Sequence, residues 1–174
     1  MTDEVPDAAR RAFEAHDAFS EDADDGAYRL ETTDFDGRVT AAESDTEWAL
    51  RYTVTVRAPT LDAAVEEDVG PNLQEGWLDT LELRSADAPG AVRERVTLDD
   101  HAVRTEGEEV VVEYVFTMGD ADRAPAVAKA MAEYVEGTYM EGVVPGFTYR
   151  PPVADLLDEA TQGDGKEGGG PMPL

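Results

Sequence analysis

The stretch WALRYTVTV, residues 48–56, alternates apolar and polar side chains and decides the fold class. Successive side chains of a strand point to opposite faces. One face of this strand would therefore carry Trp48, Leu50, Tyr52, Val54 and Val56. Such alternation is typical of an antiparallel sheet with one buried face and one wet face, and a disordered chain does not produce it.

Other stretches predict further strands around this one. Residues 109–118 are the most apolar and predict a central strand. Strands are also predicted at 28–32 and 39–44, with Asp36-Gly37 as the tight hairpin turn between them. Residues 92–98 and 101–105 predict two short strands separated by Asp99-Asp100.

Apolar residues at helical spacing predict the helices. The first covers residues 4–19 and is followed by an acidic loop. Thr60 caps a short helix, Leu73 to Leu81 form the stripe of a second one, and Asp120 or Asp122 caps a helix that ends at Gly137. Residues 138–152 are irregular, and a short helix follows at 153–160.

The fold class predicted from this order is α+β. The order is helix, three strands, two helices, two or three strands, and helix. A single antiparallel sheet of five to six strands with helices packed on one face buries every apolar stripe. Residues 1–160 form one domain in this prediction, and the Gly- and Pro-rich residues 161–174 form a disordered tail.

Charge is the strongest feature of the composition. Asp and Glu number 40 against 14 Lys and Arg, a formal net charge of −26, and only two of the 14 are lysine. Screening shortens to about 3 Å at 1 M salt, which relieves the self-repulsion of such a chain. We therefore predict a halophilic protein of the cytoplasm, since no export signal or bilayer-spanning apolar run is present. The same charge argues against nucleic acid as a partner, and the lack of a bilayer-spanning run argues against a membrane.

Catalytic and cofactor motifs do not emerge from the sequence. It has no cysteine, no glycine-rich phosphate loop and no nucleophile elbow. His16 and the Asp99-Asp100-His101 trio are explained as packing and turn residues, and the acidic clusters as solvated faces. No metal or cofactor is predicted, and no carboxylate pair can be nominated for general acid–base chemistry because carboxylates are everywhere.

The least ordinary segment is Tyr139 to Val153, which is irregular and rich in aromatic residues and proline. It could dock a partner or line a pocket. Alternatively, it covers the apolar face of the sheet. The candidate partner-binding residues are Tyr139, Phe147, Tyr149 and Arg150.

Three segments carry a resemblance: RAPTLDAAV at 57–65, EGWLDTLE at 75–82 and GFTYRPPV at 146–153. They resemble a family of small haloarchaeal proteins of unknown function, which implies a halophilic cytosol and no catalytic residues. The element order is also similar to that of type III secretion chaperones. That likeness implies a dimeric protein that binds unfolded or extended partner segments, but it is one of topology alone.

The function predicted from these observations is a non-enzymatic protein-interaction or chaperone-like module, with a protein as partner and a homodimer left open. The alternative is a small-molecule-binding domain or an enzyme that uses carboxylates, which would need a deep pocket where acidic side chains converge.

Overall fold

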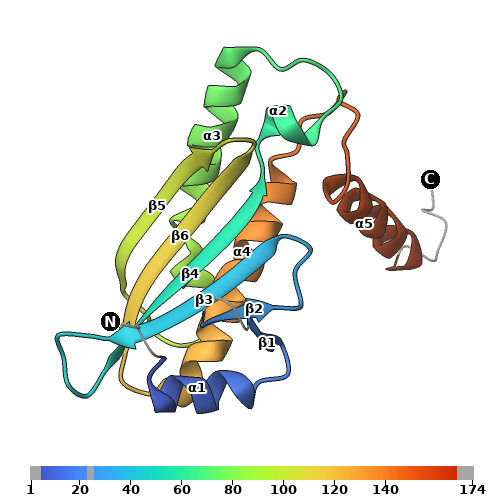
Figure 1. Cartoon of the computed structure of the whole chain (residues 1–174). Helices are drawn as coiled ribbons and strands as arrows, with labels where there is room; N and C mark the ends of the chain where they lie inside the picture. Colours follow the sequence, from blue (N-terminus) through green and yellow to red (C-terminus); the bar gives the residue numbers. More distant parts are fainter. Residues whose placement is uncertain (1–4, 23–25, 168–174) are drawn as a thin grey trace.

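The chain forms one six-stranded antiparallel sheet with helices on one side (Figure 1). The computed structural model describes residues 5–22 and 26–167, with side chains as far as Thr161. The strands, in the order β1-β2-β3-β4-β6-β5, are β1 (Phe19–Asp22), β2 (Ala27–Leu30), β3 (Asp36–Glu43), β4 (Leu50–Pro59), β5 (Leu98–Glu106) and β6 (Glu109–Met118). The helices are α1 (Asp7–Glu14), α2 (Leu61–Ala64), α3 (Pro71–Ser85), α4 (Ala124–Glu141) and α5 (Val153–Glu167), with 3-10 turns η1 (Ala88–Ala91) and η2 (Ala121–Arg123). The predicted α+β class and single antiparallel sheet are confirmed.

The centre of the sheet is the antiparallel pair of β4 and β6. Tyr52 lies opposite Phe116, and Val54 lies opposite Tyr114. These four side chains are completely buried and form the middle of the core. The alternation in residues 48–56 therefore predicted the inner face correctly from Tyr52 to Val56, whereas Trp48 lies before β4 and is 77% exposed.

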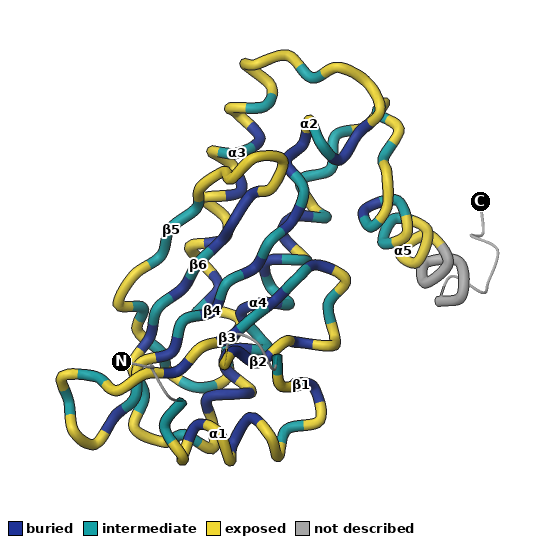
Figure 2. The backbone as a smooth tube through the Cα atoms, viewed as in Figure 1, coloured by how far each residue is buried: buried dark blue, intermediate teal, exposed yellow. Residues whose placement is uncertain are grey.

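The helices cover the inner face of the sheet, with α4 at the centre. In Figure 1 the sheet faces the viewer and α3 and α4 lie behind it. Figure 2 shows buried positions along β4, β6 and α4. At the β1–β2 side, Phe13 of α1 stacks on Tyr28 at a ring distance of 5.1 Å. The core thus joins residues from the first helix to the fourth.

The first half differs from the prediction at two strands. Phe19–Asp22, expected to lie in the first helix and in the loop after it, forms edge strand β1, and α1 ends at Glu14. Asp36-Gly37 is not the hairpin turn but the start of β3. The reversal instead occupies residues 31–35, because Phe35 is buried against Tyr139 and Glu136 of α4 accepts hydrogen bonds from the backbone N–H groups of Asp34 and Phe35.

The second half differs at element ends. The strand predicted at 92–98 does not form, because residues 92–97 are irregular, whereas the one predicted at 101–105 belongs to β5, in which the register shifts between Leu98 and Asp100. The helix predicted to end at Gly137 continues to Glu141 because Thr138 and Tyr139 complete its buried stripe. Helix α5 runs to Glu167, past the boundary predicted at residue 160. Residues 168–174 lie outside the described part, so the disordered tail stays a prediction there.

No helix within residues 5–22 and 26–167 combines the length and the apolar character needed to span a bilayer.

Candidate functional site

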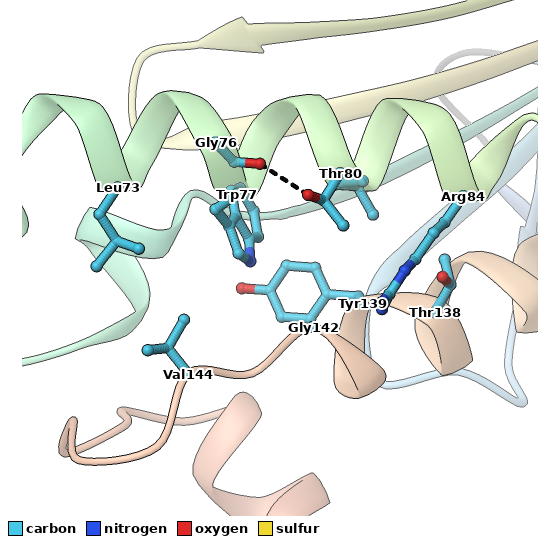
Figure 3. Close-up of a pocket in the computed structure, with 10 residues that line it drawn as sticks. Leu73, Gly76, Trp77, Thr80, Arg84, Thr138, Tyr139, Gly142 and Val144 are labelled. Atoms are coloured by element: carbon cyan, nitrogen blue, oxygen red, sulfur yellow. Dashed lines mark hydrogen bonds between the residues drawn. The ribbon is translucent and has the colours of Figure 1, made fainter.

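An apolar groove between α3 and α4 is the best-formed concave site that we find (Figure 3). It encloses about 290 Å³. One wall comes from α3, which begins at Pro71, a residue suited to the first helical turn. The other wall comes from the end of α4 and the two residues Gly142 and Val144 after it. We call this site the α3–α4 groove.

Two aromatic rings form the floor of the α3–α4 groove. Trp77 and Tyr139 meet edge to face, with ring centroids 5.3 Å apart. Tyr139 also packs edge to face on Phe35 at 4.7 Å. Its hydroxyl donates a hydrogen bond of 2.8 Å to the carbonyl oxygen of Pro59, and burial raises the pKa of this phenol. The ring is therefore held in place from the sheet side, as a rigid wall requires.

The rim of the groove is apolar on one end and cationic on the other. Leu73 is 40% exposed at one end. Arg84, exposed at the opposite end, extends from α3 toward Thr138 in Figure 3 and makes no ion pair with a described residue. Thr80 donates its hydroxyl proton to the Gly76 carbonyl oxygen at 2.9 Å, which satisfies this polar group within the helix.

The groove has no acidic lining. None of the ten residues that the structure places around it is Asp or Glu. The chain has 40 acidic residues among 174, so a concave surface without them is unusual for this protein. The deep pocket of converging carboxylates, which the enzyme alternative needs, is not found in this groove.

Of the four predicted partner-binding residues, the structure brings only Tyr139 to the groove. Phe147 and Tyr149 are partly buried nearby, and Arg150 is exposed. The Tyr149 hydroxyl accepts a hydrogen bond of 2.7 Å from the N–H of Val144, which is itself a lining residue. Tyr149 thus supports the groove wall from behind.

The segment from Gly142 to Pro152 does not cross the sheet. It is fixed to the chain around α2 by backbone hydrogen bonds: Arg150 donates to the carbonyl of Ala64, and Glu66 donates to that of Thr148. The carboxylate of Glu67 accepts from the N–H of Thr148, and hydrogen bonding with the side chain and then the backbone of Thr148 lowers the pKa of Glu67. The segment therefore lies beside α2, and its first residues form part of the wall of the groove.

A serine–histidine contact lies outside the groove. The Oγ atom of Ser85 and Nε2 of His101 are 2.9 Å apart, and the His101 ring stacks on Tyr114 at 5.2 Å. Burial lowers the pKa of His101, although Glu82 and Asp100 act in the opposite direction. Ser85 is fully buried, so no substrate reaches its hydroxyl. The contact joins the end of α3 to β5 and is structural.

The acidic clusters also have local roles. Glu106 pairs with Arg104 at 2.7 Å and with Arg57 at 3.5 Å, and these partners lower its pKa. Of the acidic residues in the loop predicted after the first helix, Asp24 and Asp25 lie outside the described residues. Within the described residues, no three His, Asp or Glu side chains gather in a way that could hold a metal ion.

Comparison with protein-family models matches residues 14–159 to the Family of unknown function (DUF5813). The chain belongs to this family. The match includes all six strands of the sheet and the α3–α4 groove, so the groove is part of the DUF5813 domain. No curated protein and no solved structure gave a match. The expectation of a family of unknown function is confirmed.

Sequence reasoning missed the α3 side of the groove in this DUF5813 chain. The sequence predicts Leu73, Trp77 and Leu81 as one apolar core stripe, whereas Thr80 and Arg84 receive no role. A signal was present: Leu73, Gly76, Thr80 and Leu83 fall near one face of the helix and carry no charge. An uncharged exposed helix face in a chain of this acidity points to a contact surface.

Proposed function

We propose that this DUF5813 chain is a non-enzymatic protein-interaction module, chaperone-like in binding an exposed apolar segment, that works in a halophilic cytoplasm. Its α3–α4 groove binds one or two apolar side chains of the partner. The observation that carries this proposal is the apolar, carboxylate-free lining of the groove in a chain of formal net charge −26.

The size of the groove favours side chains over a large ligand. Sites for drug-sized molecules and cofactors are typically about 300–1,000 Å³. The 290 Å³ of this groove is at the lower end of that range. Aromatic residues are enriched at protein interfaces, and the fixed Trp77–Tyr139 pair supplies a preformed surface of this kind.

The rim indicates where a charged group of the partner would lie. Arg84 is exposed beside the groove and has no ion pair with a described residue, so its guanidinium is available for a carboxylate. Leu83, the residue before Arg84 on α3, is 75% exposed and extends the apolar surface of the groove. A partner segment with Leu or Phe next to Asp or Glu fits both features.

The experiment uses Trp77 as a reporter. Replacing the exposed Trp48 by Phe leaves Trp77 as the one tryptophan, since the chain has two. Short peptides containing Leu-Phe beside Asp are titrated in molar KCl, with Ala-Ala and Lys versions as comparisons. We expect a saturable change in Trp77 fluorescence that is strongest for the Leu-Phe-Asp peptide.

Thr80→Glu in the groove and Thr161→Glu on α5 form a matched pair of variants. Both threonines are exposed and donate to a helix carbonyl four residues earlier. A carboxylate at residue 80 should weaken peptide binding at least about tenfold, because it puts a charge in an apolar contact, whereas Thr161→Glu should bind as the parent. Equal binding by both variants would remove the groove as the partner site.

A small-molecule function is the second candidate, favoured by the aromatic floor with Arg84 at one end. The same titration with free aromatic carboxylic acids separates the two proposals. Saturable binding of such an acid with no response to any peptide would favour the small-molecule function.

A further inference from the structure

The sheet has a second large surface, the face opposite the helices, which we call the open face. Its residues alternate with the core residues along β2 to β6. Among the described elements, no helix lies over it (Figure 1). The strand register places Arg38, Thr55, Glu113 and Ala102 in one row across this face. Thr53 lies opposite Val115 in a neighbouring row.

Arginine is concentrated on the open face. Five of the chain's 12 arginines lie there, at positions 29, 38, 51, 57 and 104. Arg57 and Arg104 lie on either side of Val111 in the register, and Val111 is fully buried although it belongs to this face. The arginine stems therefore cover it, as long amphipathic side chains do.

Ion pairs balance most of the charge at the end of the open face beside the β5–β6 turn. Arg104 pairs with Glu106 at 2.7 Å and with Glu113 at 3.6 Å. Arg57 pairs with Glu106 and with Glu109 at 3.6 Å. Between these networks and the β3–β4 loop lie Thr and Val side chains. In a chain of formal net charge −26, this is a surface where a second acidic molecule meets little repulsion.

Charges without an ion pair lie at opposite sides of the open face. Arg29 on β2 lies directly opposite Arg38, a like-charge pairing that is unfavourable, and has no ion pair with a described residue. On the other side, Asp99 accepts a hydrogen bond from Thr117, and neither it nor Asp100 has an ion pair with a described residue. The sheet order places β2 and β5 on either side of β4.

We propose that the open face binds a second copy of the chain. A two-fold axis that lies between the two sheets and runs along the strands brings the β2 side of one copy over the β5 side of the other. Arg29 of each copy then lies over the row that contains Ala102 of its partner, its long side chain points to Asp100 in the next row, and each contact occurs twice. The Thr and Val side chains near the axis form the centre, with ion pairs around them, as in other interfaces.

Sedimentation equilibrium of the full chain tests this pairing, at the lowest KCl concentration at which circular dichroism shows the wild type folded. We expect a mass of about twice the 18.8 kDa of the chain. Val115→Glu, one strand from the axis, should raise the dissociation constant at least about tenfold, because it places a carboxylate of each copy inside the Thr and Val centre of the interface. Leu83→Glu adds the same charge on the exposed side of α3 and should leave the dimer unchanged.

A charge swap identifies the orientation. Arg29→Asp and Asp100→Arg should each weaken the dimer, by roughly fivefold since symmetry repeats the lost pair, and the double variant should restore it. A wild type that stays monomeric would overturn the proposal. So would a dimer that ignores Val115→Glu, or one that the double charge swap fails to restore.

Discussion

At the residue scale, three buried tyrosines in this fold differ in what their hydroxyl groups bind. Tyr139 donates to the Pro59 carbonyl and Tyr114 donates to the Ser85 carbonyl at 2.6 Å. The Tyr52 hydroxyl is buried without a hydrogen-bond partner among the described residues, and burial raises its pKa to about 12. The same chemical change at these positions should therefore have opposite effects.

Tyr52→Phe should raise the free energy of unfolding by about 1 kcal/mol, because it removes a buried polar group that has lost its water. Tyr139→Phe should lower it by about 1 kcal/mol, because the Pro59 carbonyl loses its donor. Denaturant titration of both variants beside the wild type measures the two changes. Tyr139→Phe keeps the ring of the α3–α4 groove, so peptide binding should persist. A loss of stability in Tyr52→Phe would show that its hydroxyl has a partner.

His101 makes a prediction about pH. Because burial lowers its pKa from 6.5, the folded chain binds this proton less readily than the unfolded chain. The stability present above pH 6.5 is therefore lost as the pH falls from 6.5 through the lowered value in the folded state.

His101→Phe keeps a ring on Tyr114 but removes the titration. Its free energy of unfolding should fall less than that of the wild type between about pH 7.5 and about pH 5.5 in the same salt. Other titrating groups, including Glu136, whose pKa burial raises, are common to both proteins and cancel in the comparison. Identical slopes for the two proteins would contradict the assignment.

At the element scale, helix α4 contains a glycine that its packing does not need. Gly137 lies within the helix, and a Cβ at this position would meet nothing within 4 Å. Gly137→Ala should therefore stabilise the chain by about 1 kcal/mol through helix propensity alone. Thermal unfolding by circular dichroism would show the change as a higher Tm.

Gly107→Ala is the control for the same substitution. Gly107 forms the β5–β6 turn with φ of 62°, a left-handed conformation in which a Cβ costs roughly 1–2 kcal/mol. This variant should lose stability although space is open around it. If both substitutions acted in the same direction, backbone conformation would not be the cause.

The elements that could be predicted are those with a strong internal period. The sequences of strands β4 and β6 alternate apolar and polar or smaller side chains over eight or more residues, so the sequence predicts which side chains face the core. Edge strand β1 has a single large apolar residue, Phe19, and exists because β2 supplies its backbone partners. Asp36-Gly37 is a good local turn signal, but the burial of Phe35 and the backbone hydrogen bond that Glu136, 101 residues away, accepts from Phe35 place the turn earlier. The α3–α4 groove also depends on contacts between distant residues, since Trp77 and Tyr139 are far apart in the sequence, and a local pattern does not predict it.

At the scale of the whole molecule, the carboxylates are on the outside. The buried polar side chains among the described residues are Thr60, Ser85 and Thr138, and none is acidic. The charge of −26 therefore acts across the surface of the compact chain and opposes folding in dilute buffer.

The free energy of unfolding should rise by at least roughly 1 kcal/mol as KCl increases from 0.2 M to 3 M, because the Debye length falls from about 7 Å to below 3 Å. Denaturant titrations across a KCl series measure it. A variant with Glu75→Gln, Asp79→Asn and Glu82→Gln, three exposed changes on α3, should show a smaller rise. A protein that is equally stable at both ends of the series would argue against a salt-adapted surface.

The central place of α4 has a consequence for synthesis. All six strands precede this helix in the chain. During synthesis, the whole sheet sequence therefore leaves the ribosome before the helix that covers the centre of its apolar face. Until residues 124–139 emerge, Tyr52, Tyr114 and Phe116 are open to misassociation with other nascent chains. The core can form only after α4 has been synthesised. Until then, we expect a cell that makes the protein to protect the apolar face of the strands from aggregation, for example with chaperones.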